Sequence, residues 1–234
     1  MESITLILDA DDTLWENNVF YEEATDAFVR RMAGEGFDED QARRLFEQVE
    51  RERIPVVGYA PLEFVNSMLI AYQRLCQMHG RLPEASVAAE VEAIARQVID
   101  YPIILLEGVA ETLPRLHRCC RLFLLTKGHP PSQQSKIDRS GLAPYFEAIH
   151  IVAEKDADVL RDLLARYGLD TERTWMVGNS PRSDINPALA VGMRAVYIPY
   201  SRPWSWEHAP LLDPTRVVIL GRFSELLDLF AEAS

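Results

Sequence analysis

The stretch LILDADDTLW, residues 6–15, places three aspartates within four positions, directly after a run of aliphatic residues. Burying an ionised carboxylate without a partner costs several kcal/mol, so Asp9, Asp11 and Asp12 must meet a cation or water. In extended geometry Asp9 and Asp11 project on the same side, close enough to repel each other when both are ionised. We expect Asp12 to be exposed. The stretch predicts a buried strand whose carboxyl end holds an acidic, cation-attracting site.

Short apolar runs bounded by turn or polar residues recur along the chain. They occupy residues 4–8, 121–126, 148–152, 174–178 and 195–198. Continuous apolar runs of this length are typical of strands buried on both faces of a parallel sheet. Helical patterns follow the later runs, at residues 132–140, 156–167, 184–191 and 222–232. This alternation predicts the α/β class, with a doubly wound, mostly parallel, Rossmann-like sheet.

About a hundred residues separate the first predicted strand from the second, which is more than one crossover requires. The gap contains four helical patterns, at residues 20–34, 39–53, 61–79 and 84–100, and another near 108–118 leads into the second strand. We therefore expect two domains. An α/β core comprises residues 1–16 and 102–234, and an inserted helical bundle comprises residues 17–101.

Composition narrows the classes of partner and compartment. A formal net charge of -12 gives no basic face for nucleic acid or an anionic membrane surface. Three cysteines, two of them adjacent, form neither a disulfide framework nor a metal-ligand spacing, which fits a reducing cytoplasm. The start, MESITLILD, has no basic region before its apolar run, so we expect neither a signal peptide nor a membrane span. The segment 199–214 contains four prolines and two tryptophans, and we expect an ordered loop that packs over a sheet edge.

Ligands of doubly wound folds bind at the carboxyl ends of the strands, so the residues after each run are the candidates. Those residues are Asp9 and Asp11, Thr126 and Lys127, Glu154 and Lys155, and Asn179 through Asp184. Mg²⁺ prefers hard oxygen ligands and takes one or two carboxylates together with water and substrate phosphate. We expect Asp9 and Asp11 to bind Mg²⁺, with Asp184 or the amide oxygen of Asn179 completing the protein ligands.

A phosphate monoester suits such a site. It can contact the metal, the Thr126 hydroxyl, the backbone N–H groups near Lys127 and a lysine ammonium at once. We assign Asp9 as the nucleophile that forms an aspartyl-phosphate, and Asp11 as the general acid and then the base that activates water. Lys155 offsets the repulsion between Asp9 and the phosphate. We expect Lys136, in contrast, to be a solvated helix residue.

The motif DADDT, residues 9–13, resembles the D-x-D-x-T/V motif of the haloacid dehalogenase superfamily. Thr126 at a strand end, then Lys155, then VGNSPRSD at residues 177–184 resemble its second, third and fourth motifs in the same order. The resemblance implies Mg²⁺-dependent phosphoryl transfer through an aspartyl-phosphate, and the inserted helices resemble the family's substrate-selecting helical cap. One departure is Asn179, which stands where the family commonly has an aspartate. It leaves open whether Asn179 or Asp184 is the direct metal ligand.

The leading hypothesis is a phosphatase for a small phosphorylated metabolite. A phosphomutase uses the same residues, and a weakly active binding or regulatory member is an alternative because Asn179 removes one negative charge. The dehalogenase branch of the family lacks the second aspartate of the first motif, so Asp11 favours the phosphatase over that alternative. Apolar helix faces in the bundle can pack within one chain or against a second copy, so the sequence leaves a monomer or a homodimer open.

Overall fold

The computed structural model describes residues 4–231. It divides into two compact units. The first, called here the α/β unit, joins the segment that ends at Asn18 to the segment that begins at Ile103. The second, the helical unit, consists of Val19–Pro102.

The α/β unit contains a six-stranded parallel sheet in the order β3-β2-β1-β4-β5-β6. The strands are β1 (Thr5–Leu8), β2 (Arg121–Lys127), β3 (Ala148–Val152), β4 (Thr174–Gly178), β5 (Arg194–Tyr197) and β6 (Val217–Ile219). This sheet confirms the predicted fold class. It adds β6, which was not predicted because its three residues, two of them half-buried and Ile219 exposed, give too short an apolar run. Strand order reverses between β1 and β4, and ligands bind at such a switch point.

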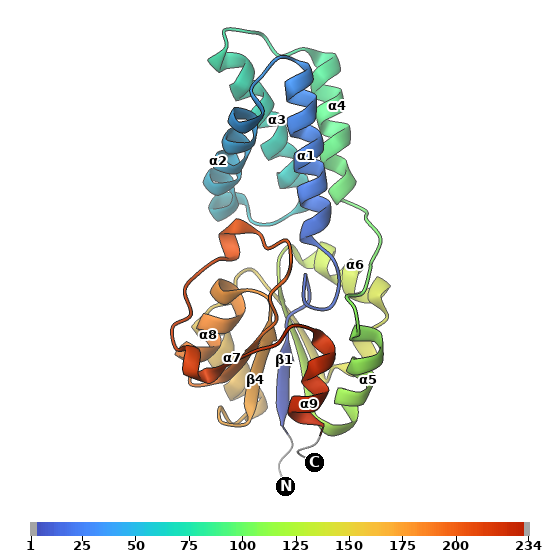
Figure 1. The fold of residues 1–234 in the computed structure, drawn as a ribbon, viewed down its shortest axis with the longest axis vertical. Helices are drawn as coiled ribbons and strands as arrows, with labels where there is room; N and C mark the ends of the chain where they lie inside the picture. Colours follow the sequence, from blue (N-terminus) through green and yellow to red (C-terminus); the bar gives the residue numbers. More distant parts are fainter. Residues whose placement is uncertain (1–3, 232–234) are drawn as a thin grey trace. The chain divides into compact units, whose positions relative to one another are not determined.

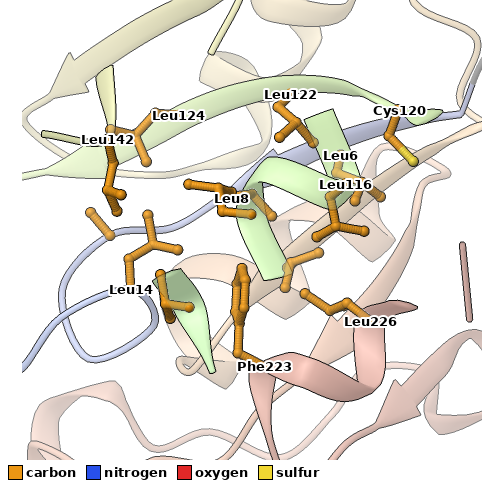
Figure 2. Close-up of a cluster of buried hydrophobic side chains, with 14 of the residues drawn as sticks. Leu6, Leu8, Leu14, Leu116, Cys120, Leu122, Leu124, Leu142, Phe223 and Leu226 are labelled. Carbon is orange, nitrogen blue, oxygen red and sulfur yellow. The ribbon is translucent and has the colours of Figure 1, made fainter. Parts of the chain in front are cut away.

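Both faces of the sheet are buried, and alternate residues of each strand serve different cores. Leu6, Leu8, Leu122 and Leu124 face one cluster, which Figure 2 shows together with Leu116 and Phe223. The intervening strand residues face the other cluster, among them Ile7, Phe123, Leu125 and Met176. This arrangement explains why the strands appear in the sequence as continuous apolar runs.

Helices cover both faces of the sheet (Figure 1). They are α5 (Val109–Cys119), α6 (Pro130–Ser140), α7 (Ala157–Tyr167), α8 (Asn186–Ala190) and α9 (Leu226–Phe230). Residues of α5 and α9 pack in the first cluster, and residues of α7 and α8 pack in the second. The helix predicted at 184–191 is instead a π-helical turn, Pro181–Ile185, followed by α8. Pro187 lacks the N–H that a regular helix would need at that position.

The helical unit has its own core. Its helices are α1 (Asn18–Gly34), which begins at the boundary between the units, α2 (Glu39–Val57), α3 (Pro61–Met78) and α4 (Ala85–Ala95). Phe28, Phe46 and Phe64 pack together with other buried residues of these helices. Helix α2 continues four residues beyond its predicted end, through Pro55, and closes where the Gly58 N–H donates to the Ile54 carbonyl at 2.9 Å. Within residues 4–231, no helix combines the length and apolarity that crossing a membrane requires.

Candidate active site

Two aspartates share one buried lysine at the carboxyl end of the sheet. Lys155 follows β3, and its ammonium donates to Asp9 Oδ1 and, at 2.5 Å, to Asp184 Oδ1. Asp9 follows β1 and Asp184 lies in the turn after β4. Their side chains are at most 6% exposed. The structure thus brings together three residues, from three strand ends, that the sequence predicted as functional.

Asp9 is held in place by the chain on either side of it. Its N–H donates to the Val177 carbonyl at 2.9 Å, which extends the pairing of β1 with β4 by one residue. Thr13 Oγ1 donates to Asp9 Oδ2 at 2.8 Å and lies 3.3 Å from the amide oxygen of Asn179. The Thr13 side chain therefore links Asp9 to the first residue after β4.

A tight turn after β4 positions Asp184. The Ser180 N–H donates to Asp184 Oδ2 at 2.9 Å, and the Ser180 carbonyl accepts from the Asp184 N–H at 2.9 Å. A Cβ atom at Gly178 would lie only 2.2 Å from Asp184 Oδ2. Glycine is therefore required at residue 178, because any side chain there would displace the carboxylate.

The charges around Lys155 do not balance. Two buried carboxylates face one ammonium, which leaves an excess negative charge in a region with little water. Burial raises the pKa of Asp184, Lys155 opposes that rise, and Asp9 adds to it, so that the pKa reaches about 7. Burial works to lower the pKa of Lys155, but Asp184 and Asp9 outweigh it and raise that pKa. An additional cation would relieve this excess charge.

The available oxygens suit magnesium better than a metal that needs many side-chain ligands. Among residues 4–231, no three His, Cys, Asp or Glu side chains lie close enough together to hold an ion. Mg²⁺ is commonly held by one or two carboxylates, with water and substrate oxygens as its other ligands. Asp9 and Asp184, with the amide oxygen of Asn179 nearby, fit that pattern.

Asp11 lies in a second cluster, around a different lysine. Lys136 of α6 donates to Asp11 Oδ1 at 2.6 Å and to Oδ2 at 2.5 Å. Gln133 Nε2 donates to Asp11 Oδ2 at 2.9 Å, and Trp15 Nε1 donates to Oδ1 at 2.7 Å. Burial would raise the pKa of Asp11, but the Lys136 ammonium and the two neutral donors outweigh it and hold that pKa below its usual value. Asp11 is therefore a carboxylate in this arrangement.

Asp9 and Asp11 bind different lysines, Lys155 and Lys136. Two expectations about residues in and around the first motif are corrected by the structure. Lys136 is buried rather than solvated, because its helix presents it to Asp11. Asp12 is buried rather than exposed, because its carboxylate accepts the N–H groups of Asn17 and Asn18 at 2.8–3.1 Å.

Thr126 and Lys127 end β2, beside β1. Thr126 is buried at this end of the strand. The Lys127 ammonium donates to Glu207 and, at 2.8 Å, to Ser183 Oγ. Lys127 therefore already pairs with a carboxylate of the chain itself.

Two polar residues of these clusters were missed in the sequence. They are Gln133 and Glu207. Ser180 and Ser183 fall within the candidate range 179–184, but neither was given a role of its own. Gln133 and Lys136 stand three residues apart on α6, a spacing that places both on one helix face. That spacing was a usable signal, whereas Glu207 lies in an irregular loop that shows no periodicity.

Known proteins resemble this chain over almost its whole length. A phosphoserine phosphatase from Thermus thermophilus is 28% identical over 231 residues, which cover 88% of this chain and 92% of the relative. A glyceraldehyde 3-phosphate phosphatase from Methanocaldococcus jannaschii is 26% identical over 233 residues, covering 96% and 95%. The matches span both the α/β unit and the helical unit.

The fold also occurs in solved structures. A haloacid dehalogenase-like family hydrolase from Xanthomonas campestris superposes with a TM-score of 0.82, at 28% identity, over 100% of this chain and 99% of that one. The family model described as haloacid dehalogenase-like hydrolase matches residues 5–192, which include Asp9, Thr126, Lys155 and Asp184. Because this match covers most of the chain and confirms the resemblance of the motifs, the protein belongs to the haloacid dehalogenase-like hydrolases.

Proposed function

We propose that the protein is a Mg²⁺-dependent phosphatase that hydrolyses a small phosphate monoester through an aspartyl-phosphate on Asp9. The observation that carries this proposal is the pair of buried carboxylates, Asp9 and Asp184, on the single ammonium of Lys155. Such a site attracts a divalent cation and, through that cation, a phosphate dianion. A carboxylate beside the phosphorus is then available as the nucleophile.

Asp9, Asp184 and Asn179 are the residues that would hold Mg²⁺. Bound there, the ion would neutralise charge on the phosphoryl oxygens and orient the phosphate toward Asp9. Asp11 was also expected to be a ligand. Its carboxylate instead binds Lys136, so we propose an acid–base role for its side chain rather than a metal-binding one.

In the first half of the reaction, an oxygen of Asp9 attacks phosphorus and the bond from phosphorus to the leaving alcohol breaks. Lys155 reduces the repulsion between the carboxylate and the incoming dianion. The Thr126 hydroxyl and the backbone N–H of Lys127 are the groups we propose for binding the phosphoryl oxygens. The leaving oxygen takes a proton from Asp11, which must therefore be protonated and released from Lys136 before this step.

In the second half, water attacks the phosphorus of the aspartyl-phosphate. Asp11, now ionised, accepts a proton from that water, and the bond between phosphorus and the Asp9 oxygen breaks. Inorganic phosphate is released and Asp9 returns to its starting state. The lowered pKa of Asp11 beside Lys136 suits this half, because it supplies the base form.

The comparisons support the proposed substrate class. The two relatives are named for phosphoserine and glyceraldehyde 3-phosphate, both small phosphorylated metabolites. A structure with the same fold, YfnB from Bacillus subtilis, is described as bound to magnesium. We extend this substrate class and this metal to the present chain, and we propose that the helical unit acts as the substrate-selecting cap.

The test is hydrolysis of an aryl phosphate and of a panel of phosphorylated metabolites, with Mg²⁺ and with a chelator. We expect turnover that is lost when the metal is removed. Hydroxylamine added during turnover should convert an acyl phosphate into a hydroxamate, and mass spectrometry should locate it on Asp9. Hydrolysis without trapping at Asp9 would contradict the proposed nucleophile.

The same purified protein separates the alternatives. A phosphomutase would convert a sugar phosphate into its isomer without releasing phosphate, and a dehalogenase would release halide from a 2-haloacid. A weakly active regulatory member would show no turnover at any Mg²⁺ concentration.

A further inference from the structure

Glu207 inserts a carboxylate between the ends of β2 and β4. It lies in the loop 199–214, within the short 3₁₀ helix Ser205–Glu207. Its carboxylate accepts from the Lys127 ammonium. It also accepts from the hydroxyls of Ser180 and Ser183, at 2.5 Å from each. The Glu207 side chain is only 12% exposed. The loop therefore does more than cover a sheet edge.

The other contacts of the two serine hydroxyls fix the acceptor to which each hydroxyl donates. Ser180 Oγ accepts the Ser183 N–H at 2.8 Å, and Ser183 Oγ accepts from the Lys127 ammonium at 2.8 Å. Each hydroxyl has one hydrogen, and each directs it to Glu207. Burial would raise the pKa of Glu207, but Lys127 and the two hydroxyls outweigh it and lower that pKa. Glu207 is thus an ionised acceptor for three donors.

The turn that Glu207 holds is the turn that carries Asp184. Ser180 and Ser183 both precede Asp184 in this turn, and the Ser180 N–H binds the Asp184 carboxylate directly. A second contact joins the same turn to the loop: the Arg182 guanidinium lies 4.8 Å from the centre of the Trp206 ring and donates to the Trp206 carbonyl at 3.2 Å. Residues 206 and 207 therefore both bind the turn.

We propose that Glu207 is a positioning residue, which fixes the turn of residues 180–184 and thereby the carboxylate of Asp184. Because Asp184 matters here as a metal ligand, the functional consequence rests on the proposed function. The positioning itself is a property of the chain and can be measured without any metal.

The first measurement is amide hydrogen exchange of the peptide that contains residues 178–186, in wild-type protein, Glu207→Ala and Glu207→Gln. Asp213→Ala is the matched control, because Asp213 lies in the same loop and its carboxylate accepts from Thr215 of that region. We expect faster exchange in Glu207→Ala and no change in the control. Added formate should slow exchange in Glu207→Ala again, because it restores a carboxylate. Glu207→Gln should lie near wild type, because its amide oxygen still accepts from the hydroxyls.

The second measurement is Mg²⁺ affinity by titration calorimetry. Glu207→Ala should bind about tenfold more weakly than wild type, and formate should recover most of that loss. Unchanged exchange and unchanged affinity in Glu207→Ala, with wild type binding Mg²⁺, would overturn the inference. Faster exchange in that variant, with no Mg²⁺ binding by wild type, would support the positioning and contradict the proposed function.

If Glu207→Ala does not fold, Glu207→Asp tests whether Glu207 positions the turn. Aspartate keeps the charge but is one methylene shorter, so it should bind the two hydroxyls poorly and give intermediate exchange. Exchange equal to that of wild type in Glu207→Asp would then overturn the inference.

Discussion

Asp9 and Asp11 are two residues apart in the sequence, yet they bind different buried lysines with different charge balance. Around Lys155, Asp9 and Asp184 give two carboxylates for one ammonium. Around Lys136, Asp11 pairs with an ammonium that also donates to the neutral amide oxygen of Asn17. Two neutral donors, Gln133 and Trp15, bind Asp11 as well. The first cluster has excess negative charge and the second is neutral overall.

This difference in charge separates two kinds of chemistry. A cluster with excess negative charge can accept a cation and then a phosphate, so its carboxylate is suited to attack. A neutral cluster keeps its carboxylate in one place and one protonation state until a substrate displaces it. The comparison therefore supports the proposal that Asp9 is the nucleophile and that Asp11 transfers protons.

The largest effect should follow from Asp9→Asn. We expect turnover of an aryl phosphate to fall by about 10⁴-fold or more, because the amide cannot form the covalent intermediate. Asp184 still neutralises Lys155 in this variant, so the thermal unfolding temperature should change little. Asp138→Asn, an exposed aspartate on α6, is the control and should keep wild-type activity. Substantial turnover by Asp9→Asn would remove the nucleophilic role from the Lys155 cluster.

Asp11→Asn should have the next largest effect. We expect a fall of about 10²- to 10⁴-fold in kcat, the range typical of a lost general acid or base. Because water activation is also impaired, a larger share of the enzyme should be trapped as hydroxamate on Asp9 during turnover. A variant that keeps most of the wild-type kcat would show that Lys136 holds Asp11 for structural reasons only.

Replacing each lysine by methionine compares the clusters in terms of stability. Lys155→Met leaves two buried carboxylates together and should cost about 3–5 kcal/mol in the free energy of unfolding. Lys136→Met leaves one carboxylate whose side chain is 20% exposed and keeps two donors, so it should cost less, about 1–3 kcal/mol.

Urea unfolding at pH 5 and pH 8 checks both values. The cost of Lys155→Met should be smaller at pH 5. Asp184 already has a raised pKa, and loss of the ammonium raises it further, so protonation at low pH removes one of the two charges. Equal costs for the two variants at pH 8 would contradict the difference in charge balance.

Much of this fold was predictable because its signals are local. Strands β1 to β5 are apolar runs that end at turn or polar residues, and the helices of the helical unit show a regular apolar face between glycines and prolines. The parallel topology made most of the site predictable as well, since parallel strands bring their carboxyl ends together. Asp9, Lys155 and Asp184 therefore meet at one edge of the sheet. The three residues of β6 and the division at Pro187 depend on packing and on one missing N–H, which periodicity does not detect.

The partners of Asp11 and Lys127 were not predictable in the same way. The sequence of helix α6 shows which of its residues share a face, but it does not indicate that this face contacts Asp11. Gln133 fits there only because Gly128, at φ +144°, has no side chain: a Cβ would lie 2.8 Å from the Gln133 amide nitrogen. Glu207 binds residues 80 and 27 positions earlier in the chain, Lys127 and Ser180. Long-range contacts between single polar residues leave no repeating pattern in a sequence.

The smallest predicted effect concerns Glu50 of the helical unit, another carboxylate whose pKa is raised by burial. Burial raises its pKa to about 8, nearby Glu22 and Glu47 add to the rise, and Arg51 opposes it. Glu50 therefore ionises more easily in the unfolded chain, so its contribution to stability is lost as pH rises from about 4.5 to about 8. Glu50→Gln should raise the free energy of unfolding by about 1 kcal/mol at pH 9, a value reduced because the side chain is half-buried. At pH 5 the variant and wild type should unfold at the same urea concentration, and a gain that is equal at both pH values would show that titration of Glu50 is not its cause.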